Sequence, residues 1–264
     1  MIIDAFIVSD EMALVDFRLE YLSRYVGKFH VVEAAHTFTG ESKPLHFTEA
    51  LNAGRFDKYK NQIIVSYPDL SVITPEEDFK EWSRETKQRN HFAKGFQYQP
   101  SDTVMMSDID EIPDNNFIRD VYFSENMLPL CLRSWFFYYS ASWVKKEQWP
   151  GTILASGQQI YKETPQKMRN RRWDLPYYGA GWHFSYFGGV QLIKNKIATF
   201  SHYAYNREPY NTIEHIKYCI ASGKDLFLRG DHEDCLPFQR WDLLPQLILS
   251  DPDKYGWMIT GEEP

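Results

Sequence analysis

An apolar run leads directly into three acidic residues in the segment Val104-Met105-Met106-Ser107-Asp108-Ile109-Asp110-Glu111-Ile112-Pro113. Near-continuous apolar runs are typical of buried strands in parallel sheets. The carboxylates then follow at the strand's end, where open α/β sheets bind ligands. Carboxylates this close repel one another unless a cation is present, and hard oxygen ligands suit Mg²⁺ or Mn²⁺. The pattern predicts a divalent-metal site at Asp108 and Asp110, with a solvated acidic turn closed by Pro113 as the alternative.

Strand and helix patterns alternate before this segment. Strand patterns cover Ile2–Val8, Phe29–Glu33 and Gln62–Tyr67, and the fourth strand is Thr103–Ser107. After the first of them, one helical face carries Leu14, Phe17, Tyr21, Leu22 and Tyr25. A second helix is predicted from Thr74-Pro75-Glu76-Glu77, with a capping hydroxyl and proline at the first turn, as far as Gly95. This alternation predicts an α/β fold with an open, mostly parallel twisted sheet and helices on both faces.

The pattern changes after Pro113. A short helix is predicted near 116–123, and aromatic strands at Leu128–Tyr139 and Gly179–Gly189. Gly151–Tyr161 is interpreted as a further strand, and Thr212–Ala221 as a helix stopped by Gly223. We therefore expect a single domain over residues 1–264. Its half 1–113 would bind a nucleotide-like ligand, and its mixed, aromatic-rich half 114–264 would bind something on which aromatic rings can stack.

Composition limits the classes of function. The 264 residues are 43% hydrophobic, enough for one large core, and no apolar run approaches a membrane span of roughly 20 residues. No leader pattern begins the chain, and the three cysteines lack paired spacing, so we expect a cytoplasmic protein without a disulfide framework. A formal charge of −7 opposes general affinity for nucleic acids.

Two further features have both functional and structural interpretations. The basic helix before the acidic strand can aim an arginine at a diphosphate, or can be an exposed helix in which Glu85 and Arg89 pair at i, i+4. His183, between Trp182 and Phe184 and flanked by glycines, is either a metal or phosphate ligand or a hydrogen-bonded core residue. His202 and His232 leave the same choice open.

Aromatic residues are dense in the second half. Trp135, Phe136, Phe137, Tyr138, Tyr139, Trp143 and Trp149 are either core residues or a platform for sugar rings, whose C–H faces pack on aromatic side chains. The sequence contains no nucleophile elbow, phosphate-binding glycine loop or dinucleotide fingerprint.

With these segments assembled, the sequence resembles glycosyltransferase family 17, the family of the bisecting β-1,4-mannosyl-glycoprotein β-1,4-N-acetylglucosaminyltransferase. The matching segments, in the family's order, are Phe29–Ala34, Thr37-Phe38-Thr39-Gly40, Lys43-Pro44-Leu45, Arg84-Glu85, Gln88-Arg89, Ser107–Pro113 and Gly181-Trp182-His183-Phe184-Ser185.

The resemblance implies a GT-A type fold, a UDP-N-acetylglucosamine donor, a glycan acceptor, inversion at the anomeric carbon and dependence on Mn²⁺ or Mg²⁺. It places Asp110 on the metal, Asp108 on the ribose or the metal's water shell, and His183 as a third metal contact. Glu33, Arg84 and Arg89 become candidates for donor binding. The acceptor base is sought among Glu111, Asp174, Asp231, Glu233 and Asp234. The Golgi members carry a membrane anchor and stem, so we expect a soluble bacterial or viral relative.

Two other functions compete with this hypothesis. A metal-dependent phosphoesterase would use the same carboxylates, although the chain lacks a second dense cluster of histidines and aspartates for a two-metal site. A non-catalytic carbohydrate-binding protein would need only the aromatic residues.

Overall fold

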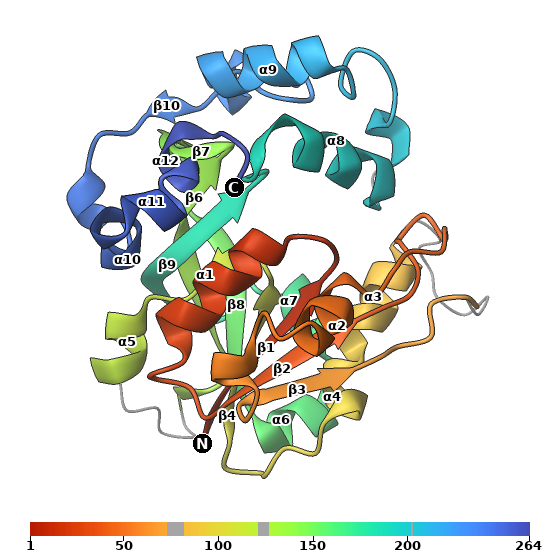
Figure 1. Ribbon diagram of the computed structural model, residues 1–264. Coiled ribbons are helices and arrows are strands. Elements are labelled where there is room, and N and C mark those ends of the chain that lie inside the picture. Colours follow the sequence, from red (N-terminus) through yellow and green to blue (C-terminus); the bar gives the residue numbers. More distant parts are fainter. Residues whose placement is uncertain (73–81, 121–126, 202) are drawn as a thin grey trace. The chain divides into compact units, whose positions relative to one another are not determined.

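The computed structural model describes residues 1–72, 82–120, 127–201 and 203–264, and the chain forms two compact units (Figure 1). The first unit contains Met1–Arg133 and Pro150–Gly181, and the second contains Ser134–Trp149 and Trp182–Pro264. The first unit thus includes residues from both halves that the sequence suggested.

Parallel strands form the sheet of the first unit. β1 (Ile2–Val8), β2 (Lys28–Glu33), β3 (Ile63–Ser66) and β4 (Thr103–Asp108) run parallel in the order β4-β1-β2-β3. β8 (Trp149–Ser156) pairs antiparallel with β4, and the complete path of the ten-stranded sheet is β10-β7-β6-β8-β4-β1-β2-β3, with β5 and β9 off it. The predicted α/β class with parallel strands is confirmed.

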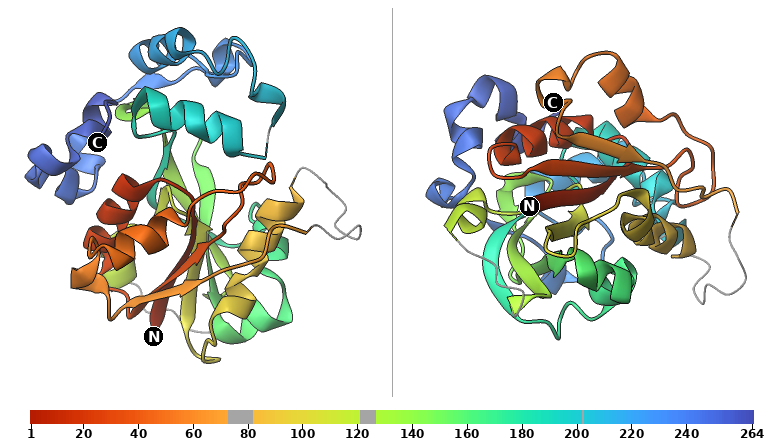
Figure 2. Two further views of the ribbon diagram at one scale, coloured as in Figure 1. Left: turned by 45° about the vertical axis from the view of Figure 1, so that its right-hand side comes forward. Right: turned by 90° about the horizontal axis from the view of Figure 1, so that it is seen from below.

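Helices cover both faces of this sheet, as predicted. α1 (Met12–Leu22) and α2 (His46–Asn52) lie on one face, and α3 (Ser83–Asn90), α4 (Phe92–Gly95), α6 (Gly157–Lys162) and α7 (Pro165–Asn170) on the other (Figure 2). Because successive side chains of a strand point to opposite faces, alternate residues Ile3, Ala5 and Ile7 face the second group of helices and pack into one core with Phe92 and Met168. The short elements η1 (Asp57–Tyr59), β5 (Glu111–Ile112) and α5 (Asn115–Asp120) complete the unit.

Aromatic residues dominate the second unit. β7 (Ser140–Val144) pairs antiparallel with β10 (Leu236–Pro237) and with the end of β6 (Leu130–Tyr138). The first residues of β6 and of β9 (Tyr177–Ser185) belong to the first unit and their last residues to the second. Its helices are α8 (Gly189–Thr199), α9 (Ile213–Ser222), α10 (Gln246–Ser250), α11 (Pro252–Tyr255), α12 (Trp257–Thr260), η3 (Tyr203–Tyr205), η4 (Asp231–Glu233) and η5 (Trp241–Leu243). The core joins Tyr138, Tyr139 and Tyr186 to aliphatic residues of α8 and α9.

Several elements differ from the prediction. The strand expected over Gly151–Tyr161 ends at Ser156, where the Ser156 and Gln159 side chains cap each other's backbone N–H groups and start α6. The helices α2, α7, α8 and α10 to α12 and the strand β7 were not predicted. The expected start of the helix at Thr74 lies outside the described residues, and its described part is divided into α3 and α4 at His91. The helix expected over 116–123 is α5, with residues 121–126 outside the described part.

The helix expected over Thr212–Ala221 is confirmed as α9. Thr212 caps α9 and Gly223 ends it in the left-handed conformation, as its sequence indicated. All three cysteines are free and buried. Within the described residues, no helix is both long and apolar enough to cross a membrane.

Candidate active site at the end of strand β4

The acidic motif lies where β4 ends. Asp108 is the last residue of that strand, paired in register with Ile7 near the end of β1, and Asp110 and Glu111 follow in the turn. Asp110 is 4% exposed and Glu111 is fully buried. The motif is therefore not a solvated acidic turn, and the expected strand-end placement is confirmed.

One buried guanidinium fixes the backbone of the motif. Arg18 of α1 is fully buried and donates to both carboxylate oxygens of Asp4, at 2.8 and 2.6 Å, and to the Ser107 hydroxyl at 2.5 Å. It also donates to the carbonyl oxygens of Asp108, Ile109 and Glu111, at 3.0, 3.1 and 3.0 Å. Because a turn's carbonyls need donors when buried, Arg18 supports the path of the chain from the strand into the turn.

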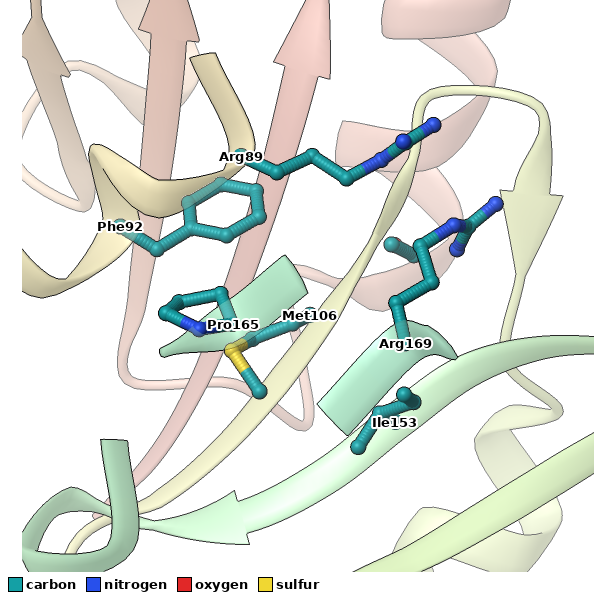
Figure 3. Close-up of a pocket in the computed structure, with 7 residues that line it drawn as sticks. Arg89, Phe92, Met106, Ile153, Pro165 and Arg169 are labelled. Atoms are coloured by element: carbon teal, nitrogen blue, oxygen red, sulfur yellow. The ribbon is translucent and has the colours of Figure 1, made fainter. Parts of the chain in front are cut away.

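Two further arginines clamp the Asp108 carboxylate. Arg89 donates to Oδ1 at 3.1 Å and to Oδ2 at 2.9 Å, and Arg169 donates to Oδ2 at 2.7 Å. Figure 3 shows both guanidinium groups, one from α3 and one from α7, pointing toward the loop after β4, above a small pocket lined by Phe92, Met106, Ile153 and Pro165. Burial raises the pKa of Asp108, but the two arginines outweigh it and lower the pKa to about 2. Asp108 is therefore ionised at neutral pH.

Glutamates complete this charge cluster. Arg89 forms the i, i+4 ion pair with Glu85 that the sequence suggested, and Arg169 forms a bidentate pair with Glu111, at 2.8 and 3.1 Å. Glu111 also accepts a hydrogen bond from the Asp108 amide at 3.0 Å. Most donors of both arginines are thus directed at carboxylates of the protein.

The other donor-binding candidates have structural contacts. Glu33, at the end of β2, accepts from the amides of Phe47 and Thr48, at 2.7 and 3.0 Å, and so caps α2. Arg84 donates to the carbonyl of Leu70 at 3.1 Å and lies against Gly40, in the loop of the matching Thr37–Gly40 segment. Contacts of Glu33 and Arg84 with a donor remain predictions.

The candidate bases lie in two places. Asp174 is exposed in the turn after α7, in the first unit. In the second unit, the Asp231 side chain is 98% exposed, Glu233 pairs with Lys145 at 3.2 Å, and Asp234 pairs with Lys224 at 2.6 Å.

The candidate histidines have different surroundings. His183 is buried in the second unit, stacked on Phe136 with ring centroids 4.7 Å apart, and its ring lies 5.0 Å from that of Trp149. Gly181, two residues earlier, passes so close to the Ile112 carbonyl that a Cβ there would lie 2.4 Å away, which fits the expected close backbone approach. His232 is exposed, and His202 lies outside the described residues. A metal contact from His183 stays a prediction.

In the described part of the chain, no group of three or more His, Cys, Asp or Glu residues is arranged to hold a metal ion. The metal assignment of Asp108 and Asp110 therefore rests on their chemistry. Asp108 has three of its roughly four lone-pair positions filled by arginine donors. A metal at this motif would need Asp110 as its main protein ligand.

Comparison with known proteins identifies the family. The model of glycosyltransferase family 17 matches residues 1–233. The chain belongs to this family. It is 24% identical over 299 aligned positions to the human beta-1,4-mannosyl-glycoprotein 4-beta-N-acetylglucosaminyltransferase, covering 98% of this chain and 55% of that protein. The rat protein of the same name is 23% identical, with 98% and 54% covered.

The chain spans about half the length of these curated relatives. Among solved structures, it is similar to the apo form of the glycosyltransferase GlyE of Streptococcus pneumoniae, with a TM-score of 0.35 and 10% identity over 67% of this chain and 44% of that one. A likeness this distant carries no argument about the site.

Sequence reasoning missed Arg18, its partner Asp4 and Arg169 at this candidate site. Arg18 lies on the apolar face of α1 with Leu14, Tyr21 and Leu22. A charged residue among positions expected in the core could have indicated a buried ion pair there. Nothing in the sequence around Arg169 connects it with Asp108, 61 residues earlier.

Proposed function

We propose that this chain transfers N-acetylglucosamine from a UDP-sugar to a glycan acceptor, with inversion at the anomeric carbon, on a GT-A type fold that uses Mn²⁺ or Mg²⁺. Family membership supports glycosyl transfer. The observation that carries the proposal is the acidic motif at the carboxyl end of a parallel strand, with Asp108 held ionised between Arg89 and Arg169. Open α/β sheets bind their ligands at this edge.

Asp110 is the residue proposed to hold the metal, because Asp108 is largely occupied by the two arginines. When bound, a divalent ion neutralises charge on a leaving diphosphate. The acceptor position left on Asp108 would take a ribose hydroxyl or a water of the metal's shell. Arg89 and Arg169 act in this proposal by keeping Asp108 charged and oriented, and Arg18 by holding the turn.

Inversion requires a carboxylate that removes the acceptor hydroxyl's proton from the face opposite the leaving group. Both oxygens of Glu111 accept hydrogen bonds from Arg169, so Glu111 fits an orienting role better. We propose that the base is one of the more accessible carboxylates Asp174, Asp231, Glu233 and Asp234.

The test is a panel of UDP-, GDP- and CMP-sugars incubated with the protein, Mn²⁺ and a mixture of glycans, with nucleotide release and glycan mass as readouts. We expect UDP release and a mass gain of one N-acetylhexosamine with UDP-N-acetylglucosamine, both lost in EDTA and restored by excess Mn²⁺. Product analysis by NMR then gives the anomeric configuration.

Other outcomes distinguish the rivals. Release of phosphate from simple phosphate esters without sugar transfer would favour a phosphoesterase. Glycan binding with no turnover of any nucleotide sugar would favour a non-catalytic carbohydrate-binding protein. Transfer that is unaffected by EDTA would overturn the metal part of the proposal.

A further inference from the structure

A guanidinium group rests on two exposed aromatic rings in the first unit. The Arg133 guanidinium carbon lies 3.5 Å from the centre of the Tyr177 ring and 5.7 Å from that of Trp173. Tyr177 and Trp173 are 54% and 53% exposed. Two aromatic side chains and a cation are therefore presented together at the surface of this unit.

Arg133 has no counter-charge among the described residues. Its Nε is buried without a hydrogen-bond partner, and no described carboxylate lies within ion-pair distance of the group. The buried arginines Arg18, Arg89 and Arg169 differ, since each is paired with carboxylates. A planar guanidinium that stacks on an aromatic ring keeps its donor fork available for a carboxylate.

The strand that carries Arg133 is tied to its neighbours. Burial and the Glu111 carboxylate raise the pKa of Cys131, two residues before Arg133, while Arg172, Arg169 and Arg133 lower it. Arg169 is paired with Asp108 and Glu111, so the cation without a described carboxylate partner here is Arg133. Arg133 is presented from β6, and the Cys131 amide donates to the Pro176 carbonyl at 2.8 Å, which ties the segment before Tyr177 to that strand.

We propose that Trp173, Tyr177 and Arg133 form a subsite for an acidic sugar, a hexuronate ring, within the acceptor glycan. The C–H face of the sugar packs on the exposed rings, and its carboxylate accepts two hydrogen bonds from Arg133. An acidic peptide would satisfy the arginine but would leave the ring faces without a flat apolar partner. The subsite rests on the proposed function and narrows its acceptor to anionic glycans.

Matched ligands test the subsite without any donor. Tetragalacturonate and a hyaluronan tetrasaccharide are each compared with their methyl esters, which keep the rings and remove the charge, by calorimetry and by tryptophan fluorescence. We expect at least one acid to bind about 10- to 100-fold more tightly than its ester, the range of a charge-assisted hydrogen bond. Arg133→Gln should abolish this preference, and Trp173→Ala should weaken both the acid and the ester.

Controls separate this effect from general damage. Arg119→Gln removes another surface arginine, and Tyr218→Ala another exposed tyrosine, and neither should change binding. Trp173→Ala alters an exposed side chain, so it tests the subsite even where Arg133→Gln folds poorly. Equal binding of acid and ester, no binding of either acid, or an unchanged preference in Arg133→Gln would overturn the proposal.

The outcome is independent of catalysis. Preferential binding of the acid by a protein that transfers no sugar would support the subsite while removing the proposed transfer. Transfer to neutral glycans only, with no binding of the acids, would support the proposed transfer and overturn the subsite.

Discussion

Arg18 illustrates how much of the candidate site depends on one residue outside the acidic motif. Its guanidinium neutralises Asp4 and supplies donors to three carbonyls of the turn. Removing one partner of a buried ion pair leaves an unpaired buried charge, whereas removing both partners is often far less costly. This difference allows the structural and positioning roles of Arg18 to be measured separately.

We predict that Arg18→Met lowers the free energy of unfolding by about 3–5 kcal/mol, because Asp4 is left charged and buried. The double variant Asp4→Leu with Arg18→Met should recover part of this loss in denaturant unfolding. Activity should not recover with it, because the carbonyls of Asp108 and Glu111 still lack their donor.

The matched control is Arg55→Met. It breaks the exposed pair of Arg55 with Asp16, which lies on α1 like Arg18, and it should change the free energy of unfolding by less than about 1 kcal/mol. If the double variant regained wild-type transfer rates in folded protein, Arg18 would have only a structural role.

Single residues also show where sequence reasoning stops. Asp4 and Arg18 could have been found, because each interrupts an apolar strand or helical face with a charge. Arg169 could not, since its partnership with Asp108 depends on how α7 returns to the sheet. The pair of Arg89 with Glu85 was one of the two interpretations of the basic helix, whereas the contact of Arg89 with Asp108 depends on the fold and had no local signal.

At the scale of elements, α3 and α7 carry the two arginines that hold Asp108. α7 is fixed at its start by Thr164, which accepts a hydrogen bond from the Lys167 amide, and by Pro165 in the first turn. Gln166 accepts from Arg89 at 3.2 Å and so links the two helices. The position of α7 therefore controls the charge environment of the motif.

We predict that Arg169→Lys reduces kcat/KM for the nucleotide sugar about 10- to 100-fold, because lysine cannot pair bidentately with Glu111 and also reach Asp108. Steady-state kinetics over a range of donor concentrations measures the change. Arg171→Lys is the control, since that neighbour forms an exposed pair with Glu163, and it should behave as wild type. Equal kinetics of the two variants would contradict the role given to Arg169.

Elements with local signals were predictable. The cap of α9, Thr212, and its terminating glycine, Gly223, are recognisable from the sequence, and β1 to β4 are apolar runs. α6 was missed because Ile153, Leu154 and Ala155 continue as a strand pattern, and the capping box formed by Ser156 and Gln159 decides the change to helix. Periodicity alone does not separate a short buried strand from the helix that follows it.

On the scale of the whole molecule, the charge cluster collects residues that are far apart in sequence, namely Asp4, Arg18, Glu85, Arg89, Asp108, Glu111 and Arg169, and all belong to the first unit. The parallel sheet brings the ends of its strands to one edge, so the motif's location followed from the fold class. Asp231, Glu233 and His183 belong to the second unit, where aromatic packing gave the sequence no comparable signal of function.

The most direct test of the central claim is the transfer rate of Asp110→Asn with UDP-N-acetylglucosamine, a glycan acceptor and saturating Mn²⁺. Asparagine keeps the shape of this buried side chain and removes the charge that the metal requires. We expect kcat to fall at least about 100-fold, with a melting temperature close to that of the wild type. Asp120→Asn, an exposed aspartate of α5, should remain fully active. Near-normal turnover by folded Asp110→Asn protein would contradict the assignment of this motif as the metal-binding active site.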